Sequence, residues 1–121
     1  MEYAHSFLGT SGQNIDDIFK YLESDSRLSM ACSTLEWSHM APTAPDTLFC
    51  YPFQDRDPFM LSRTPDVYFI GNQPAFESRV VESEKDDEVK SRVVLVPRFA
   101  QNGEIVLLNC RTSECRVIRF E

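Results

Sequence analysis

Pro65-Asp-Val-Tyr-Phe-Ile-Gly-Asn-Gln73 contains a short, wholly apolar run, Val67 to Ile70, that begins soon after a proline and ends at Gly71. Apolar runs of this length between Pro and Gly are typical of β-strands rather than helices. We therefore expect a strand here. The segments on its two sides differ, because helical periodicity precedes the run and strand-like segments follow it.

Two helices are predicted upstream. Asn14 is the expected N-cap of the first, and Asp17 three residues later gives a capping-box arrangement. Its apolar residues recur at i, i+3, i+4 and i+7 and share one face: Ile15, Ile18, Phe19 and Leu22. The second helix is expected from Arg27 to about His39. Its buried side has the same spacing: Leu28, Ala31, Cys32 and Leu35.

A short strand is expected at the start, over Tyr3 to Leu8, followed by the turn Gly9-Thr10-Ser11-Gly12. A turn between a strand and a helix N-terminus can bind an anion. This one lacks the lysine of a P-loop and the spacing of a dinucleotide fingerprint. We interpret it as a structural turn.

Residues 41–60 combine prolines with large aromatic residues. The set comprises Pro42, Pro45, Pro52, Pro58, Phe49, Tyr51, Phe53 and Phe59. Proline at this density prevents a continuous helix or a central strand. The segment is too apolar to lie free in solvent, which leaves two interpretations open. It packs internally, or it binds a partner through aromatic and Met anchors, for which we select Tyr51, Phe53, Phe59 and Met60.

Strands dominate the remainder. They are expected over residues 78–81, 92–96, 104–109 and 115–120, with a charged turn at 83–88. Asn102-Gly103 is a strong hairpin signal, and a second turn is expected near Thr112-Ser113. The sequence thus predicts an α/β (α+β) fold in one domain of 121 residues, two helices followed by an antiparallel β-meander.

Composition limits the possible functions. A formal net charge of −7 argues against a large surface that grips DNA phosphates, and 42% hydrophobic residues suffice for a folded core. The N-terminus does not resemble a signal peptide, and no apolar stretch approaches the roughly 20 residues of a membrane span. We expect an intracellular protein in a reducing compartment.

No active site is evident from the residues alone. Cys110 and Cys115 have a spacing that metal ligands can have, but Cys32 and Cys50 are isolated and no His lies near them, so we expect four reduced, partly buried cysteines. Four aspartates stand beside Pro or Arg in loops, where Asp commonly caps turns: Asp46, Asp55, Asp57 and Asp66. Neither a nucleophile elbow nor a Cys/His pair is present.

Three stretches resemble the small (B, regulatory) subunits of DNA polymerase delta. They are Gly9-Thr-Ser-Gly-Gln-Asn-Ile-Asp-Asp-Ile18, then Ala41-Pro-Thr-Ala-Pro-Asp-Thr-Leu48 with Cys50-Tyr-Pro-Phe53 and Asp57-Pro-Phe59, and finally Pro65 to Gln73, which is similar to that family's P-H-V-Y-F-x-G-N. Order and spacing agree from about Phe7 to Phe120.

This family is a degenerate branch of the calcineurin-like metallophosphoesterases. Active relatives hold two metal ions with histidines, which polarise a phosphate and generate hydroxide. The resemblance aligns Ser11 with the first His position, and Asn72 and Pro74 with the two later ones. A hydroxyl, a neutral amide and a proline cannot rebuild a dinuclear site. The resemblance therefore implies no catalysis, no bound metal and no cofactor.

What the resemblance implies is a scaffold. Members of this family bind the C-terminal metal-binding domain of the polymerase delta catalytic subunit and a further accessory subunit. They act in the nucleus, in DNA replication and repair, and contact DNA only indirectly; no membrane is involved. Two alternatives remain open: a residual metal-dependent phosphoesterase, and a non-functional truncated fragment.

Family members are several times longer, with an oligonucleotide-binding-like domain and the first half of the phosphoesterase domain upstream. The resemblance makes residues 1–121 a partial, inactivated domain, the C-terminal half of a metallophosphoesterase-like β-sandwich. Helix residues such as Ile15, Phe19 and Leu35 are then expected to lack packing partners and to be exposed.

Overall fold

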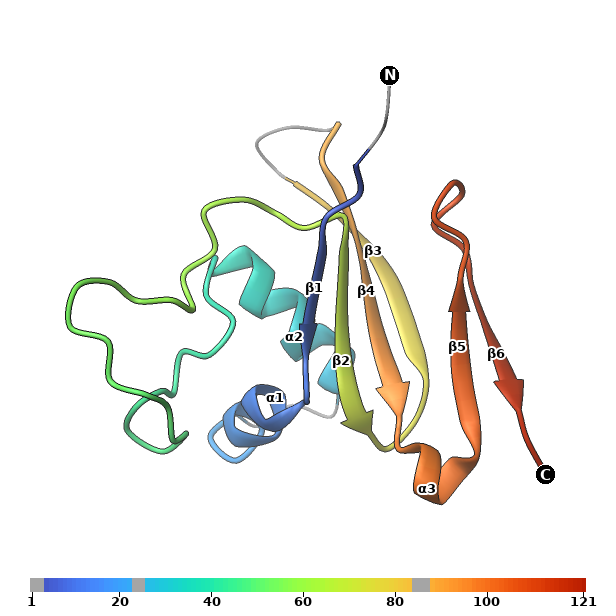
Figure 1. Ribbon diagram of the computed structural model, residues 1–121, viewed down its shortest axis with the longest axis horizontal. Coiled ribbons are helices and arrows are strands. Elements are labelled where there is room, and N and C mark those ends of the chain that lie inside the picture. The colour runs from blue at the N-terminus through green and yellow to red at the C-terminus, as the bar shows by residue number, and fades with distance from the viewer. Residues whose placement is uncertain (1–3, 23–25, 84–87) are drawn as a thin grey trace.

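The computed structural model describes residues 4–22, 26–83 and 88–121. It has a four-stranded sheet with helices packed on it and a separate two-stranded hairpin (Figure 1). The elements are β1 (Phe7–Thr10), α1 (Gln13–Ile18), α2 (Arg27–Glu36), β2 (Val67–Gln73), β3 (Glu77–Glu82), β4 (Lys90–Pro97), α3 (Phe99–Asn102), β5 (Glu104–Leu108) and β6 (Cys115–Arg119). The predicted mixed α+β class is confirmed.

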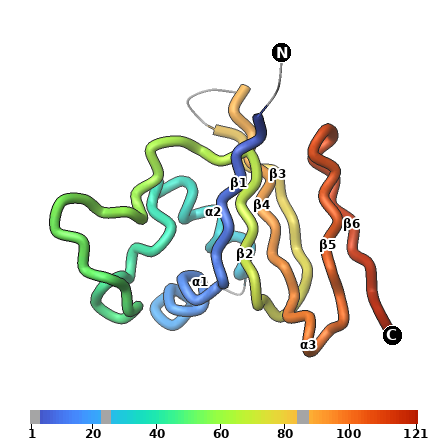
Figure 2. The backbone as a smooth tube through the Cα atoms, viewed as in Figure 1, coloured from blue at the N-terminus to red at the C-terminus, as the bar shows by residue number. Residues whose placement is uncertain are grey.

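The order of strands in the large sheet is β1-β2-β4-β3. β1, β2 and β4 are parallel, and β3 is antiparallel to β4. The predicted antiparallel meander therefore holds for the pairs β3–β4 and β5–β6, whereas β2 pairs with β4 in parallel and β5–β6 forms a separate sheet. The apolar run Val93–Leu95 is buried, which favours a central position for β4. β4 pairs antiparallel with β3, which precedes it in the chain and lies at the edge of the sheet. On its other side β4 pairs with β2, to which it runs parallel (Figure 2).

The hairpin predicted at Asn102-Gly103 does not form. Asn102 ends α3, and Gly103 is its C-cap, with a φ of 62° and an N–H that donates to the Phe99 carbonyl at 2.8 Å. β4 and β5 belong to different sheets. A glycine with positive φ serves a helix C-cap as well as a hairpin, so the signal was ambiguous. The second turn is confirmed, because β5 and β6 pair antiparallel across Ser113.

The ends of the first elements differ from prediction. β1 includes Gly9 and Thr10, so the turn is shorter, and residues 1–3 lie outside the described residues. The N-cap of α1 is Gly12, not Asn14. Asn14 is instead buried, and its Nδ2 donates to the Met40 carbonyl at 2.7 Å and to the Tyr68 hydroxyl at 3.2 Å. Its Oδ1, the atom that would cap a helix, accepts from the Thr10 hydroxyl at 2.9 Å instead.

α2 begins as predicted, with the Ser26 hydroxyl accepting from the Ser29 amide at 3.1 Å, but it ends at Glu36. Most of the charged turn expected at 83–88 lies outside the described residues. Within the ranges that are described, no helix is long and apolar enough to cross a bilayer.

The core lies between the helices and one face of the large sheet. It comprises Ile15, Ile18, Leu28, Met30, Ala31, Cys32, Tyr68, Ile70, Val93 and Leu95. Ile15 is 0% exposed, and Phe19 and Leu35 pack against the same cluster. The expectation that these residues are exposed was wrong, because α1 and α2 find their partners within this chain.

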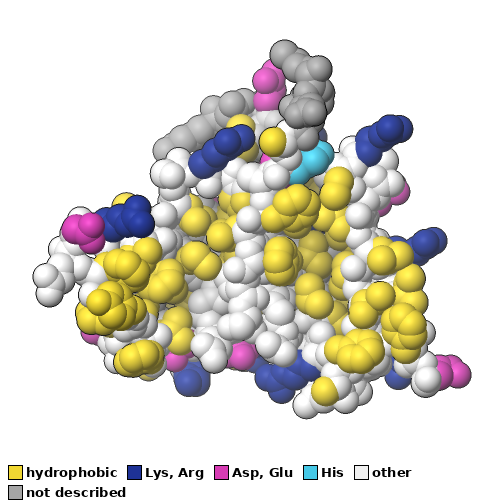
Figure 3. Space-filling model, in the orientation of Figure 1, with side chains coloured by type: hydrophobic (Ala, Val, Ile, Leu, Met, Phe, Trp, Pro, Cys, Tyr) yellow, Lys and Arg dark blue, Asp and Glu magenta, His cyan; other side chains and the backbone are white. Residues whose placement is uncertain are grey.

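The exposed apolar surface lies on the opposite face. Phe7 of β1 and Phe69 of β2 are 51% and 40% exposed. They point away from the helices, because alternate residues of a strand face opposite sides. Hydrophobic side chains gather across the middle of the molecule and over the β5–β6 hairpin in the view of Figure 3. We call this side of the large sheet, opposite the helices, the open face.

Candidate functional site

The carboxyl ends of β1 and β2 lie together at one edge of the sheet. Ser11 and Asn72 lie at these strand ends, and the Asn72 Nδ2 donates to the Ser11 backbone carbonyl at 3.0 Å. Their approach depends on Gly12, whose φ is 97° and at which a Cβ would lie 2.1 Å from the Gly71 carbonyl oxygen. Such edges of parallel sheets commonly bind ligands.

The side chains at this edge do not fit a metal centre. Ser11 and Asn72 contribute a hydroxyl and an amide, and Pro74 contributes only a backbone carbonyl, which accepts from the Asn102 Nδ2 at 3.0 Å. Throughout residues 4–22, 26–83 and 88–121, no three His, Cys, Asp or Glu side chains form a group that could hold a metal ion. Hydrogen bonding within the chain occupies the amide and the carbonyl instead.

A polar network that sequence reasoning missed lies beside this edge. Arg27 of α2 forms an ion pair with Asp16 of α1, and its Nη1 donates to the Oε1 of buried Gln73 at 3.1 Å. The Arg27 guanidinium also lies 4.6 Å from the centre of the Phe19 ring. An Arg at the first position of a predicted helix carried no sign of this role. The network joins both helices to β2.

The loop aspartates and the cysteines do not come together in one site. The Asp66 carboxylate accepts from the Ser6 amide at 2.7 Å, and this hydrogen bond holds the pKa of Asp66 below its usual range. None of the four cysteines is in a disulfide; Cys50 and Cys115 are partly buried, whereas Cys32 is buried and Cys110 is exposed. None of these groups forms a metal-binding cluster among the described residues.

The aromatic loop (residues 41–60) is the second candidate site. Its two ends are held together, because the Met40 amide donates to the Phe59 carbonyl at 3.0 Å and the Leu61 amide donates to the Ser38 carbonyl at 2.7 Å. A bridge pairs His39 with Met60. The loop is therefore anchored at the end of α2 rather than hanging from two separate points.

Asp57 fixes the second half of this loop. The His39 Nδ1 accepts from the Ala41 amide at 3.2 Å, which assigns the proton to Nε2, 2.6 Å from an Asp57 oxygen. The other Asp57 oxygen accepts from the Phe59 amide at 2.9 Å. These two hydrogen bonds, from His39 first and Phe59 second, hold the pKa of Asp57 below its usual range.

Asp17 anchors the first half of the loop to α1. Its carboxylate accepts from the Thr47 hydroxyl at 2.7 Å and lies 3.5 Å from the Lys20 ammonium. The Thr43 hydroxyl, which has no hydrogen bond of standard geometry, faces the same carboxylate. The hydroxyls of Thr43 and Thr47 together hold the pKa of Asp17 below its usual range, against the opposing effect of burial.

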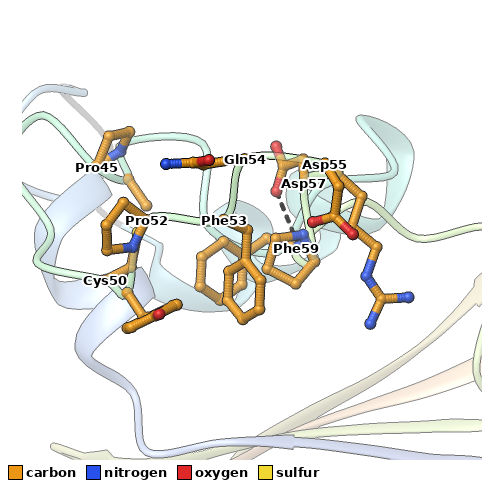
Figure 4. A pocket seen from close by; sticks show the side chains of 12 residues that line it. Pro45, Cys50, Pro52, Phe53, Gln54, Asp55, Asp57 and Phe59 are labelled. Atoms are coloured by element: carbon orange, nitrogen blue, oxygen red, sulfur yellow. Dashed lines mark hydrogen bonds between the residues drawn. The ribbon is translucent and has the colours of Figure 1, made fainter.

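The aromatic loop surrounds a pocket of about 420 Å³. Figure 4 shows Phe53 and Phe59 at the centre of its lining, between Pro52 and Asp55. The Tyr51 and Phe53 rings meet edge to face, with centroids 5.2 Å apart.

Of the four residues selected from the sequence, Tyr51, Phe53 and Met60 are 73%, 48% and 65% exposed, and Phe59 is half-buried. The exposure of Tyr51, Phe53 and Met60 favours partner binding over internal packing as the interpretation of this loop. They form an accessible apolar surface on an anchored loop.

The chain is similar to known proteins over most of its length. Residues 3–78 match the family described as the DNA polymerase alpha/epsilon B subunit. The chain belongs to this family.

Among curated relatives, the DNA polymerase delta small subunit of Arabidopsis thaliana is 48% identical over 114 residues, 94% of this chain and 26% of that protein. DNA polymerase delta subunit 2 of Drosophila melanogaster is 40% identical over 113 residues, 93% of this chain and 26% of that protein. The small subunit of Saccharomyces cerevisiae is 37% identical over 137 residues, covering 94% and 28%.

These relatives confirm the resemblance to polymerase delta small subunits. The chain spans about a quarter of their length. The assignment of this part to a phosphoesterase domain, and the residues selected within it, stay predictions.

Proposed function

We propose that this chain is a non-catalytic interaction module of a DNA polymerase delta accessory subunit. Its partners are the C-terminal domain of the catalytic subunit and a further accessory subunit. It acts in the nucleus and does not bind DNA directly. Membership of the B-subunit family and the names of the relatives support this role. The net charge of −7 favours protein partners over nucleic acid.

The observation that carries the proposal is the anchored, exposed aromatic loop. Hot spots of interfaces are rich in aromatic residues that fill pockets on the partner. The loop offers such residues around a preformed pocket, and hydrogen bonds accepted by the Asp57 and Asp17 carboxylates hold its shape. A shape that exists before binding reduces the entropy lost on association.

The absence of catalysis is supported by the donor set at the carboxyl edge. Ser11, Asn72 and Pro74 provide no imidazole, and the Asn72 amide is hydrogen-bonded to its neighbour. A purified chain is expected to cleave no phosphodiester substrate with manganese or magnesium. Metal-stimulated cleavage that is lost in Asn72→Ala would contradict this part of the proposal.

Binding is tested with the purified C-terminal domain of a polymerase delta catalytic subunit, using calorimetry. The double variant Tyr51→Ala, Phe53→Ala is expected to weaken binding by about thirtyfold, because two central aromatic anchors are removed. Tyr21→Ala, at an exposed aromatic residue outside the loop, is the control and should leave affinity unchanged. Equal affinity of the double variant and the control would reject the loop as the binding surface.

A further inference from the structure

We propose that the pocket of the aromatic loop accepts an arginine side chain of the partner protein, a step that rests on the proposed function and specifies the chemistry of the residue received. The pocket has a volume of about 420 Å³. Three of its features favour a guanidinium: ring faces that solvent can reach, more carboxylates than cations, and one carboxylate that has no ion-pair partner.

Two walls of the pocket are exposed aromatic rings. Tyr51 and Phe53 both line it, and they are 73% and 48% exposed. Their ring planes are inclined at 73°, so the two rings form adjoining walls rather than one stack. Since the face of an aromatic ring carries negative partial charge, a cation that lies over such a face is attracted to it.

The charged residues of the lining also favour a cation. There are two carboxylates, Asp55 and Asp57, against one guanidinium, Arg56. Asp57 is already hydrogen-bonded to His39 and to the Phe59 amide. Asp55 is exposed and, within the part of the chain that the structure describes, forms no ion pair, even with the adjacent Arg56. Asp55 is therefore the carboxylate with which an incoming cation can pair.

A guanidinium fits this combination better than an apolar side chain or an ammonium. It is planar, so it can stack on a ring and still direct a fork of N–H groups to a carboxylate. An apolar side chain would cover the Asp55 carboxylate without pairing it, which costs free energy. The chain itself contains the same combination elsewhere, because the Arg27 guanidinium lies 4.6 Å from the centre of the Phe19 ring and forms an ion pair with Asp16.

The first test follows the binding of two short peptides to the whole 121-residue chain by NMR. The probe is an acetylated and amidated tripeptide with arginine between two glycines. Its matched control contains citrulline instead, which keeps the shape of the side chain but has no charge. The arginine peptide should shift the amide signals of Tyr51, Phe53 and Asp55 in a saturable way and bind about fivefold or more tightly than the control. Equal binding of the two peptides, or the lack of a saturable shift in the aromatic loop, would overturn the proposal.

Variants of the lining separate the charge of the ring face from apolar contact. Phe53→Leu keeps an apolar side chain but removes the ring, whereas Phe53→Tyr keeps the ring. Asp55→Asn removes the free carboxylate, and its control is Asp46→Asn, at an exposed aspartate of the same loop outside the pocket lining. Phe53→Leu and Asp55→Asn should each weaken binding of the arginine peptide by about three- to fivefold. The two controls should bind it as the wild type does, and equal affinity within either pair of variants would overturn the proposal.

Calorimetry with the C-terminal domain of the catalytic subunit distinguishes this proposal from the proposed function. Suppose that the double variant Tyr51→Ala, Phe53→Ala weakens binding of the domain and Asp55→Asn does not. The loop would then remain the binding surface, and its preference for arginine would be overturned. Saturable binding of the arginine peptide by a chain that does not bind the domain would instead reject that partner and support the chemistry of the pocket.

Discussion

The two faces of the four-stranded sheet are both apolar, yet one is covered far more completely than the other, where Val67 and Val94 are buried but Phe7 and Phe69 are not. Along β2, Tyr68 and Ile70 are fully buried under the helices, whereas Phe69, between them, is 40% exposed on the other side. Strands that are apolar on both faces are typical of sheets with a layer on each side. The sequence of β2 therefore encodes a second layer, of which the β5–β6 hairpin supplies only a part.

The covered face also holds a network of paired buried polar groups, whereas the buried Ser91 hydroxyl on the same face has no hydrogen bond among the described residues. The Tyr68 hydroxyl accepts from the Asn14 amide and lies 3.3 Å from the Thr34 hydroxyl, which donates to the Ala31 carbonyl. Buried polar groups are costly unless paired, and this network pairs them across both helices and β2. We infer that the helices and the covered face of the sheet form an independent core. Substitutions on the two faces of β2 should therefore differ in their effect on the free energy of unfolding.

The largest effect is expected for Ile70→Ala. Removing a fully buried side chain from a packed core should lower the free energy of unfolding by about 2–5 kcal/mol. Phe69→Ala, the next residue on the open face, should cost clearly less, because its ring already contacts water. Urea unfolding followed by circular dichroism measures both. Equal losses would show that the two faces are equally covered in solution.

Gly12→Ala is expected to follow closely, at about 2–4 kcal/mol. The left-handed backbone disfavours an L side chain, and the new Cβ would meet the Gly71 carbonyl oxygen at 2.1 Å. Gly71→Ala is the matched control, since its Cβ would have only ordinary contacts, the nearest at 3.4 Å. Thermal unfolding of the pair decides whether the close approach of β1 and β2 at the carboxyl edge needs this glycine.

Features of the two faces that depend on neighbouring residues could be predicted from the sequence, whereas features that depend on contacts distant in the chain could not. Apolar spacing located the helix face with Ile15 and Ile18, because periodicity is local. Asn14 was predicted to cap a helix, but its side chain is hydrogen-bonded to Met40 and Tyr68, which are distant in the chain. Asn102 was predicted to lie in a hairpin turn, but it ends helix α3. Parallel pairing of β2 with β4 and the Arg27 network depend on contacts between segments far apart in the chain. The aromatic loop was selected from its composition, and its exposure could be learned only from the fold.

Acid should act on the covered half through Asp17. Its folded pKa lies below the ordinary value of 3.8, so its stabilising effect is complete above about pH 4 and is lost as pH falls through the folded value. Asp17→Asn should lower stability at pH 7 by about 1 kcal/mol and flatten the loss below pH 4. Asp46→Asn, an exposed aspartate of the same loop, is the control. Unfolding curves of Asp17→Asn and wild type that remain parallel from pH 7 to about pH 2 would contradict this assignment.

The smallest effect is expected for Phe7→Ser on the open face. Half of this side chain is already exposed, so the free energy of unfolding should fall by less than about 1 kcal/mol. Binding of a fluorescent apolar dye should fall at the same time, because the ring lines the apolar groove between the open face and β5. A loss as large as that of Ile70→Ala would mean that this face is covered in solution by other molecules of the chain. Stability would then rise with protein concentration, since association contributes to it by mass action.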